Sequence, residues 1–217
     1  MDFARAVARL TPLPRPLPAG PEELTPVLLA GPARVPVRWD ATTTRPAAVL
    51  VLLYADRDGQ ARVLLTERVV GGTHHSGEVS FPGGRSEPED ADATATAIRE
   101  ATEEVGLDPD AVGLRVLGSL DPVWIPVSGF RLTPVIATAE RQPIYRAEPR
   151  EVGRILEPPL AAFLPGCPID IVERELGDRL IRYGAYPIDG LHVWGATARV
   201  LGQLGAILSA GPSSPSR

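Results

Sequence analysis

The chain has 217 residues and a formal net charge of −5, with 44% hydrophobic and 23% charged residues. These values fit one globular domain, or one domain with a modest appendage, and argue against a general nucleic-acid binder. All 22 basic residues are arginine, which excludes a lysine base or a Schiff-base lysine. The single cysteine, Cys167, excludes an internal disulfide and suits a reducing cytoplasm.

Residues 1–46 are predicted to form a proline-rich amino-terminal arm. Residues 2–10 can form a short helix, which is too short and too charged for a signal peptide or a membrane span. Prolines recur through residues 11–46, which predicts extended chain with one helical turn within 22–30. We expect an arm packed along the domain or a loose leader, and a proline-rich ligand for a partner protein is the alternative.

Strands are predicted where apolar runs are bounded by turn residues. The run AAVLVLLY at 47–54 is continuous, as in a strand that is buried on both faces. A turn around Asp58-Gly59 follows it. Further strands are predicted at 61–68, 114–120 and 131–139, and a hairpin around Gly177-Asp178 joins 171–176 to 177–188.

The segments between these strands are predicted loops. One loop, at 69–80, contains His74 and His75, and another, at 121–130, contains Trp124 and Phe130. A short turn or helix followed by a second segment is expected within 148–164.

A helix is predicted at the carboxy-terminal end of the domain, over 192–208. Its spacing would bury one face, made of Val193, Thr197, Val200 and Leu204. Residues 209–217 are expected to form a flexible tail. The domain itself would therefore span residues 47–208.

The stretch from Phe81 to Leu107 joins a glycine turn to a helix. It reads FPGGRSEPEDADATATAIREATEEVGL, and its Pro-Gly-Gly sequence cannot continue regular structure. Asp90 or Asp92 can cap the helix that follows, and Gly106 can end it.

This helix has two chemically different faces. At about 100° per residue an apolar stripe would face the core, formed by Thr94, Ile98, Ala101 and Val105. Glu100, Glu103 and Glu104 gather about 140° away around the helix. Like charges at this spacing disfavour a helix by a few tenths of a kcal/mol each, which Arg99 offsets in part through Glu103.

Two interpretations of the three carboxylates are open. They can form a solvated acidic face, or they can bind a divalent cation. Mg²⁺ and Mn²⁺ prefer oxygen ligands, and Mg²⁺ keeps several waters and is shared between a few carboxylates and a substrate phosphate. The glycine turn directly before the helix favours the cation, because backbone groups can approach a ligand closely there.

The same stretch resembles the Nudix box, Gly-x5-Glu-x7-Arg-Glu-apolar-x-Glu-Glu-x-Gly-apolar. The matching positions are Gly84, Arg99, Glu100, Ala101, Glu103, Glu104, Gly106 and Leu107. The chain departs from the pattern twice: Asp90 stands where the first glutamate belongs, and one extra residue separates it from Arg99. The extra residue is typical of the coenzyme A diphosphatase branch of Nudix hydrolases.

Three further blocks are similar to that branch and occur in the same order. They are LLTER at 64–68 followed by GEVSFPGG at 77–84, SGF-x-x-TP at 128–134, and VWGATARVL at 193–201. The segment from Val69 to Thr73 departs from the branch, which usually has a basic residue where Thr73 stands. This departure concerns substrate preference more than catalysis.

The resemblance implies an α/β (α+β) fold, a Nudix-type α/β/α sandwich with a mixed β-sheet between helices. It implies a metal-dependent hydrolase that cleaves the diphosphate of coenzyme A or its derivatives into 3′,5′-ADP and 4′-phosphopantetheine. Mg²⁺ or Mn²⁺ would be the cofactor, because the charge of a diphosphate must be neutralised before water attacks phosphorus.

The resemblance also implies roles for individual residues. Glu100 and Glu104 would bind the metal, with Glu103 and the backbone carbonyl of Gly84 completing its shell. The expected catalytic residues are Glu103, Arg99, which orients a carboxylate, and Glu151, the candidate base, with Glu148 as its alternative. The expected substrate contacts are Arg68, His75, Gly83 and Phe130.

Other functions stay open. The substrate can be another nucleoside diphosphate derivative, such as ADP-ribose or NADH, or the chain can be a non-catalytic nucleotide-binding Nudix module or a structural protein with an accidental box. We expect a cytoplasmic protein that acts on a small molecule, without nucleic-acid or membrane partners. A homodimer is one of the assemblies left open.

Overall fold

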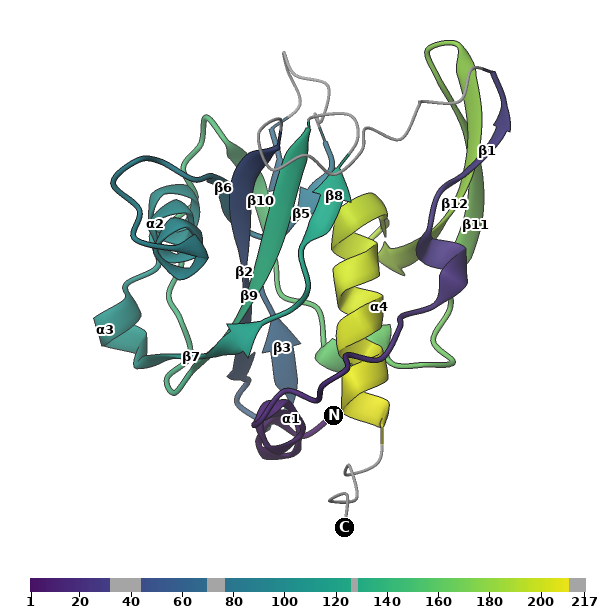
Figure 1. Ribbon diagram of the computed structural model, residues 1–217. Helices are drawn as coiled ribbons and strands as arrows, with labels where there is room; N and C mark the ends of the chain where they lie inside the picture. The colour runs from purple at the N-terminus through teal and green to yellow at the C-terminus, as the bar shows by residue number, and fades with distance from the viewer. Residues whose placement is uncertain (32–43, 70–76, 126–128, 211–217) are drawn as a thin grey trace.

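A six-stranded mixed sheet forms the centre of the fold (Figure 1). The computed structural model describes residues 1–31, 44–69, 77–125 and 129–210. The path of the sheet is β3 (Ala61–Val63), β2 (Arg45–Ala55), β9 (Phe130–Ala139) and β7 (Leu114–Ser119), with β6 (Gly83–Arg85) on β2 and β8 (Val123–Ile125) on β9. Strands β2 and β9 are parallel, and the other pairs are antiparallel.

Helices cover both faces of this sheet. Helix α2 (Ala93–Val105) lies on one side and α4 (Gly195–Ser209) on the other, as Figure 1 shows. Alternate residues of β2 therefore enter different cores: Leu50 and Leu52 share one with Ala101 of α2, and Val51 and Leu53 share the other with Leu204 of α4. Residues 47–54 are all buried, which confirms the predicted two-sided burial of this strand. The predicted α/β/α sandwich is confirmed.

A small antiparallel sheet lies beside the central one. It consists of β10 (Val152–Leu156), β4 (Leu65–Arg68) and β5 (Val79–Ser80). The single strand predicted at 61–68 is wrong, because the chain leaves the central sheet at Leu64, after β3, and continues in this second sheet as β4. The turn expected near residue 148 is present, since the N–H of Glu151 donates to the carbonyl of Glu148 at 3.0 Å. Strand β10 follows it, and then the 3-10 turn η2 (Leu160–Phe163).

A third antiparallel sheet projects from the body of the molecule (Figure 1). It contains β1 (Val27–Ala30), β12 (Arg179–Ile188) and β11 (Asp170–Leu176), and β13 (Leu191–Val193) pairs with the far end of β12. The hairpin around Gly177-Asp178 is confirmed. The helical turn predicted within 22–30 is limited to the 3-10 turn η1 (Glu22–Leu24), because the following residues pair with β12.

Residues 1–24 pack against the body. Helix α1 (Phe3–Leu10) begins at Asp2, whose carboxylate accepts a hydrogen bond from the N–H of Arg5 at 3.0 Å. Ala6 and Leu10 of this helix are fully buried in the core that α4 also contacts. The N–H of Phe3 donates to the carbonyl of Gly59, which ties the amino-terminal end to the β2–β3 turn.

Four smaller differences from the sequence expectations remain. Short strands β5 and β8 form inside the loops predicted at 69–80 and 121–130, since each pairs with a longer strand. Helix α4 begins at Gly195 rather than at residue 192, because Val193 belongs to β13. A further short helix, α3 (Pro109–Val112), follows α2, and residues 211–217 of the expected tail lie outside the described residues. Among the described helices, none has the length and apolarity needed to cross a bilayer.

Candidate active site

Helix α2 carries the candidate site and has well-defined ends. The carboxylate of Asp92 accepts from the N–H of Ala95 at 2.9 Å, and Gly106 ends the helix with a positive φ of 65°. The buried stripe includes Ala101 and Val105, as predicted, but Thr94 and Ile98 are only half-buried. The helix is rotated so that its buried face instead includes Thr96, Ala97 and Glu104.

Glu104 is the buried carboxylate of the site. The sequence predicted that it lies with Glu100 and Glu103 away from the core, but its exposure is 4%. Its Oε2 accepts a hydrogen bond from the N–H of Gly83 at 3.3 Å. Burial raises the pKa of this carboxyl to about 7, although the charge of Arg68 and the Gly83 hydrogen bond act against the increase.

Glu100 lies directly against the glycine turn. A Cβ atom placed on Gly84 would be 2.5 Å from the Glu100 carboxyl group, so only glycine permits this approach. Burial raises the pKa of Glu100, and the neighbouring Arg99 charge lowers it in part. The charge of Glu151 adds a smaller increase to the pKa values of both Glu100 and Glu104, so these three carboxyl groups share one electrostatic environment.

Arg99 connects the glycine turn to the helix. Its Nη1 is 3.1 Å from a carboxylate oxygen of Glu100 and 3.1 Å from one of Glu103. Its Nη2 donates to the carbonyl of Arg85, in β6, at 3.0 Å. Its guanidinium also donates twice to Asp90, at 3.0 Å from Nε and from Nη2. Arg99 therefore holds the loop, the helix and two carboxylates in one arrangement.

Glu103 and Glu151 lie at the rim of the site. The side chain of Glu103 is 59% exposed, in contrast to Glu104. It lines an open hollow of about 760 Å³ together with Glu148, Pro149, Arg150 and Glu151. This loop is docked on the end of α2, because the N–H of Glu148 donates to the carbonyl of Glu104 at 2.8 Å. The fold thus brings the predicted base next to the carboxylate helix.

Two carboxylates, Glu100 and Glu104, rather than a cluster of three side chains, are suited to bind a divalent cation. Within the ranges that the structure describes, no three Asp, Glu, His or Cys side chains stand close enough together to hold a metal on their own. Glu100 and Glu104 nevertheless have raised pKa values, from burial first and from mutual or neighbouring charge in addition. A dication relieves both costs, and Mg²⁺ is commonly bound by one or two carboxylates together with a substrate phosphate.

The predicted substrate contacts lie in different places. Arg68 ends β4 close enough to Glu104 to affect its pKa, and Gly83 donates to Glu104. Phe130 begins β9, and the guanidinium of Arg45 lies 4.5 Å from its ring centroid. His75 lies outside the described residues, so the structure does not place it.

The sequence missed two features of this region. Asp90 stands as a departure from the box pattern, yet it is the acceptor that fixes Arg99. The ion pair between Glu67 and Arg154, with 3.1 Å between Arg154 Nε and a carboxylate oxygen of Glu67, joins β4 to β10. The alternation of β4 could have assigned Glu67 and Arg68 to opposite faces, but β10 was not predicted as a strand.

Comparisons with known proteins identify the family of this chain. The NUDIX domain family matches residues 44–163, more than half of the chain. The chain is 38% identical over 176 residues to the Uncharacterized Nudix hydrolase NudL of Escherichia coli (strain K12), which covers 79% of this chain and 86% of the relative. It is also 38% identical over 174 residues to Nudix hydrolase 15, mitochondrial, of Arabidopsis thaliana. This second match covers 76% of this chain but only 60% of the relative.

Solved structures are more distant. A Nudix hydrolase from M. smegmatis, RenU, shares 24% identity with a TM-score of 0.46, over 54% of this chain and 72% of that one. The family assignment therefore rests on the match to the NUDIX domain family and on the identity to the E. coli relative. Because the family match covers more than half of the chain, and the chain covers most of the E. coli relative, this protein belongs to the Nudix family and is a hydrolase that acts on pyrophosphate bonds.

Proposed function

We propose that this Nudix hydrolase cleaves the diphosphate linkage of coenzyme A or its derivatives, with Mg²⁺ or Mn²⁺ as its cofactor. The products are 3′,5′-ADP and 4′-phosphopantetheine, which retains the acyl group of an acylated substrate. Nudix hydrolases in general use divalent metal ions. The substrate assignment rests on the sequence blocks at 64–84, 128–134 and 193–201, which resemble the coenzyme A diphosphatase branch.

One observation carries the metal-dependent chemistry: the close approach of Glu100 and Glu104 to the glycine turn. Glu104 is almost fully buried and bonded to the Gly83 N–H, and the Glu100 carboxyl group fills the space above Gly84. Two carboxylates kept in such a setting are costly without a cation. We assign Glu100, Glu104 and the carbonyl of Gly84 to the metal, with Glu103 holding its outer waters.

The bound cation would neutralise diphosphate oxygens and lower the pKa of a coordinated water. We assign the proton of the attacking water to the carboxylate of Glu151. As the water oxygen bonds to phosphorus, the bond between phosphorus and the bridging oxygen breaks, and the leaving group departs as a phosphate monoester. Glu151 can act here because the 148–151 loop is docked on the end of α2.

The remaining residues orient the site. Arg99 keeps Glu100 and Glu103 in place and has its own orientation fixed by Asp90, so its role is positioning. Arg68 and the backbone of Gly83 are assigned to the substrate phosphates. Phe130, stacked on the Arg45 guanidinium, is assigned to the nucleotide. His75 is assigned to the substrate because of its position in the sequence, where the coenzyme A diphosphatase branch often has a histidine.

A substrate panel tests this function. Purified protein is incubated with coenzyme A, an acyl-coenzyme A, ADP-ribose and NADH, each with Mg²⁺ or Mn²⁺, and products are identified by mass. We expect 3′,5′-ADP from coenzyme A and no product after chelation of the metal. Preferred turnover of ADP-ribose or NADH would show that this nucleotide is the substrate instead, and binding without any turnover would favour a nucleotide-binding module.

A cytoplasmic location stays a prediction. A homodimer is also a prediction, which light scattering can test.

A further inference from the structure

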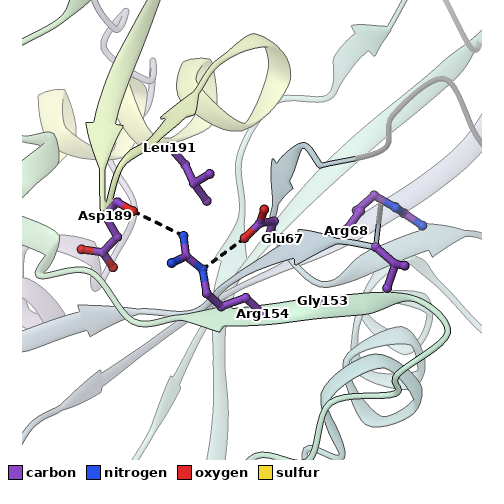
Figure 2. Close-up of a pocket in the computed structure, with 7 residues that line it drawn as sticks. Glu67, Arg68, Gly153, Arg154, Asp189 and Leu191 are labelled. Carbon is purple, nitrogen blue, oxygen red and sulfur yellow. Dashed lines mark hydrogen bonds and ion pairs between the residues drawn. The ribbon is translucent and has the colours of Figure 1, made fainter. Parts of the chain in front are cut away.

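A hollow of about 450 Å³ lies along β4 and β10. Figure 2 shows its lining, with Arg154 between Glu67 and Asp189 and the Arg68 side chain pointing away from Arg154. The walls come from β4, β10 and the turn between β12 and β13. This volume lies within the range of about 300–1,000 Å³ that is typical of small-molecule sites.

Arg68 connects this hollow to the active site. It lines the hollow, and its partner in the β4–β10 ladder, Val152, directly follows Glu151 in the chain. Arg154 is opposite Glu67, the neighbour of Arg68, in the β4–β10 ladder. Val69, which also lines the hollow, donates its N–H to the carbonyl of Glu151 at 3.1 Å, so the hollow adjoins the loop that carries the proposed base. A substrate whose phosphates lie at Glu100 and Glu104 can therefore extend into it.

The charges in the hollow are already matched, which disfavours a phosphate there. Arg154 is paired with Glu67 at 3.1 Å, and its Nη2 donates to the carbonyl of Asp189 at 3.4 Å. Of the other charged lining residues, Arg68 points away from Arg154 (Figure 2) and is assigned to the substrate phosphates, and Asp189 is acidic, so neither attracts a phosphate into the hollow. An anionic group would have to displace Glu67 from Arg154, whereas an uncharged group would not.

The other lining groups suit an uncharged chain that contains amides. Leu191 and Val69 offer apolar surface. The ladder between β4 and β10 shifts its register between Val152 and Arg154, so Gly153 sits in a β-bulge, where a peptide group is left outside the ladder. The Asp189-Gly190 turn has positive φ at both residues, 49° and 80°, as in a tight type I′ hairpin, and it fixes Leu191 beside the hollow.

We propose that this hollow is a second substrate subsite, which binds the uncharged, amide-containing arm of the diphosphate substrate, with Arg154 as a specificity-determining residue. The inference rests on the proposed function, since it assigns a place to the pantetheine half of coenzyme A, which is released as 4′-phosphopantetheine. Glu67 and the Asp189 carbonyl hold Arg154, which presents its remaining donor capacity to amide carbonyls of the arm.

Gly153 provides a direct test, because a side chain can be added there. A Cβ at this residue would meet its nearest atom, the carbonyl oxygen of Glu67, at 3.5 Å, which is an ordinary contact. We expect Gly153→Leu to fill the hollow and to lower the ratio of kcat/KM for coenzyme A to that for ADP-ribose, which lacks the arm, about tenfold. Arg154→Ala, which removes the guanidinium, should lower the same ratio.

Arg182→Ala is the matched control. Arg182 is also an exposed strand arginine paired with a glutamate, Glu173, but in the projecting sheet, and its loss should leave the ratio unchanged. Thermal unfolding of each variant checks that it is folded. If coenzyme A is turned over and the ratio is unchanged in both folded hollow variants, the subsite is overturned while the proposed function stands.

Direct binding separates the two hypotheses further. Pantetheine, the arm without nucleotide or phosphate, is added to the wild-type protein and its saturation-transfer NMR signal is recorded. We expect a signal that Gly153→Leu abolishes and Arg182→Ala retains. If the wild-type protein gives this signal but does not hydrolyse coenzyme A, the missing hydrolysis refutes the proposed substrate, and the signal supports the subsite. A signal that Gly153→Leu leaves unchanged would refute the subsite.

Discussion

Asp90 accepts two hydrogen bonds from the guanidinium of Arg99, from Nε and from Nη2, each at 3.0 Å. Asp90 also accepts from the hydroxyl of Thr96 at 2.9 Å, so it ties the loop to the first turns of α2. The pair holds the pKa of Asp90 well below its usual range, through the Arg99 hydrogen bond first. The aspartate thus supplies the acceptor for Arg99 although it is shorter than glutamate and one residue farther from the arginine than the family pattern has it.

Asp90→Asn is expected to lower kcat by about 10–100-fold, because Arg99 loses a charged acceptor and no longer fixes Glu100 and Glu103. Steady-state kinetics at saturating Mg²⁺ measure the loss. Asp90→Glu should recover part of the activity, since it restores the carboxylate. Equal activity of Asp90→Asn and wild type would show that Arg99 needs no partner in the loop.

Glu104→Gln should abolish metal-dependent turnover and yet stabilise the metal-free protein above pH 7. The pKa of Glu104 rises from 4.5 to about 7 on folding, so the native state holds its proton more tightly than the unfolded state. Below pH 4.5 the carboxyl is protonated in both states and costs nothing. Between pH 4.5 and 7 the unfolded state has lost this proton while the native state still holds it, so stability falls by on the order of 3 kcal/mol across this window and levels off above pH 7, where both states are ionised.

Urea unfolding in the presence of a chelator measures this difference between pH 4.5 and 8. The advantage of Glu104→Gln should grow with pH, and Glu103→Gln, at an exposed position, serves as the control and should show little change. Mg²⁺ should stabilise the wild type more at pH 8 than at pH 5, because bound carboxylates must be ionised. A Glu104→Gln variant with near-normal activity would remove Glu104 from the metal site.

Gly84→Ala tests the close approach of the glycine turn. The added methyl group would lie 2.5 Å from the Glu100 carboxyl group, so that carboxyl group must move. We expect a weaker response to Mg²⁺, measured as the metal concentration for half-maximal rate, and a kcat reduced at least tenfold. Arg85→Ala removes an exposed side chain from the same strand and is the control. An unchanged metal response in Gly84→Ala would show that Glu100 can bind from another position.

Glu151→Gln tests the proton acceptor. We expect kcat to fall by about 10²–10⁴-fold while the Mg²⁺ concentration for half-maximal rate changes little, because Glu151 is not assigned to the metal. Glu148→Gln is the matched variant in the same loop and should retain activity. If Glu148→Gln loses activity instead, the proton acceptor is Glu148.

Leu10→Ala tests how strongly the amino-terminal helix holds to the body. Leu10 is fully buried against the core that contains α4, so truncation should cost about 2–5 kcal/mol of unfolding free energy. Leu28→Ala, at a residue that is 38% exposed, should cost less than about 1 kcal/mol. Chemical unfolding of both variants measures the contrast. Equal, small effects would mean that residues 1–10 contribute little to the stability of the domain.

Local signals in the sequence predicted the elements that depend on local physics. The continuous apolar run of β2 specified a doubly covered strand. Gly106 specified the end of α2, and its start was narrowed to Asp90 or Asp92, of which Asp92 is the cap. The β11–β12 hairpin follows from its central Gly177-Asp178 turn. The box residues, with Glu100 and Glu104 four positions apart, indicated the carboxylate helix.

Elements that depend on distant partners were missed. Strand β10 forms because β4 lies beside it, and β1 forms because β12 offers a free edge; neither segment has an apolar alternation of its own that is strong enough to predict it. The break between β3 and β4 has the same cause, since Leu64 stands where the chain passes from one sheet to another.

The sequence by itself determined the chemistry of this protein: which carboxylates stand on one helix, that a glycine turn precedes them, and that an arginine lies among them. Only the tertiary structure decided how these carboxylates differ. Packing of α2 on the sheet buries Glu104 and leaves Glu103 in solvent, although the two are adjacent in the chain. The rotation of a helix against its sheet is set by the fit of many side chains, and the spacing of three glutamates contains no information about it.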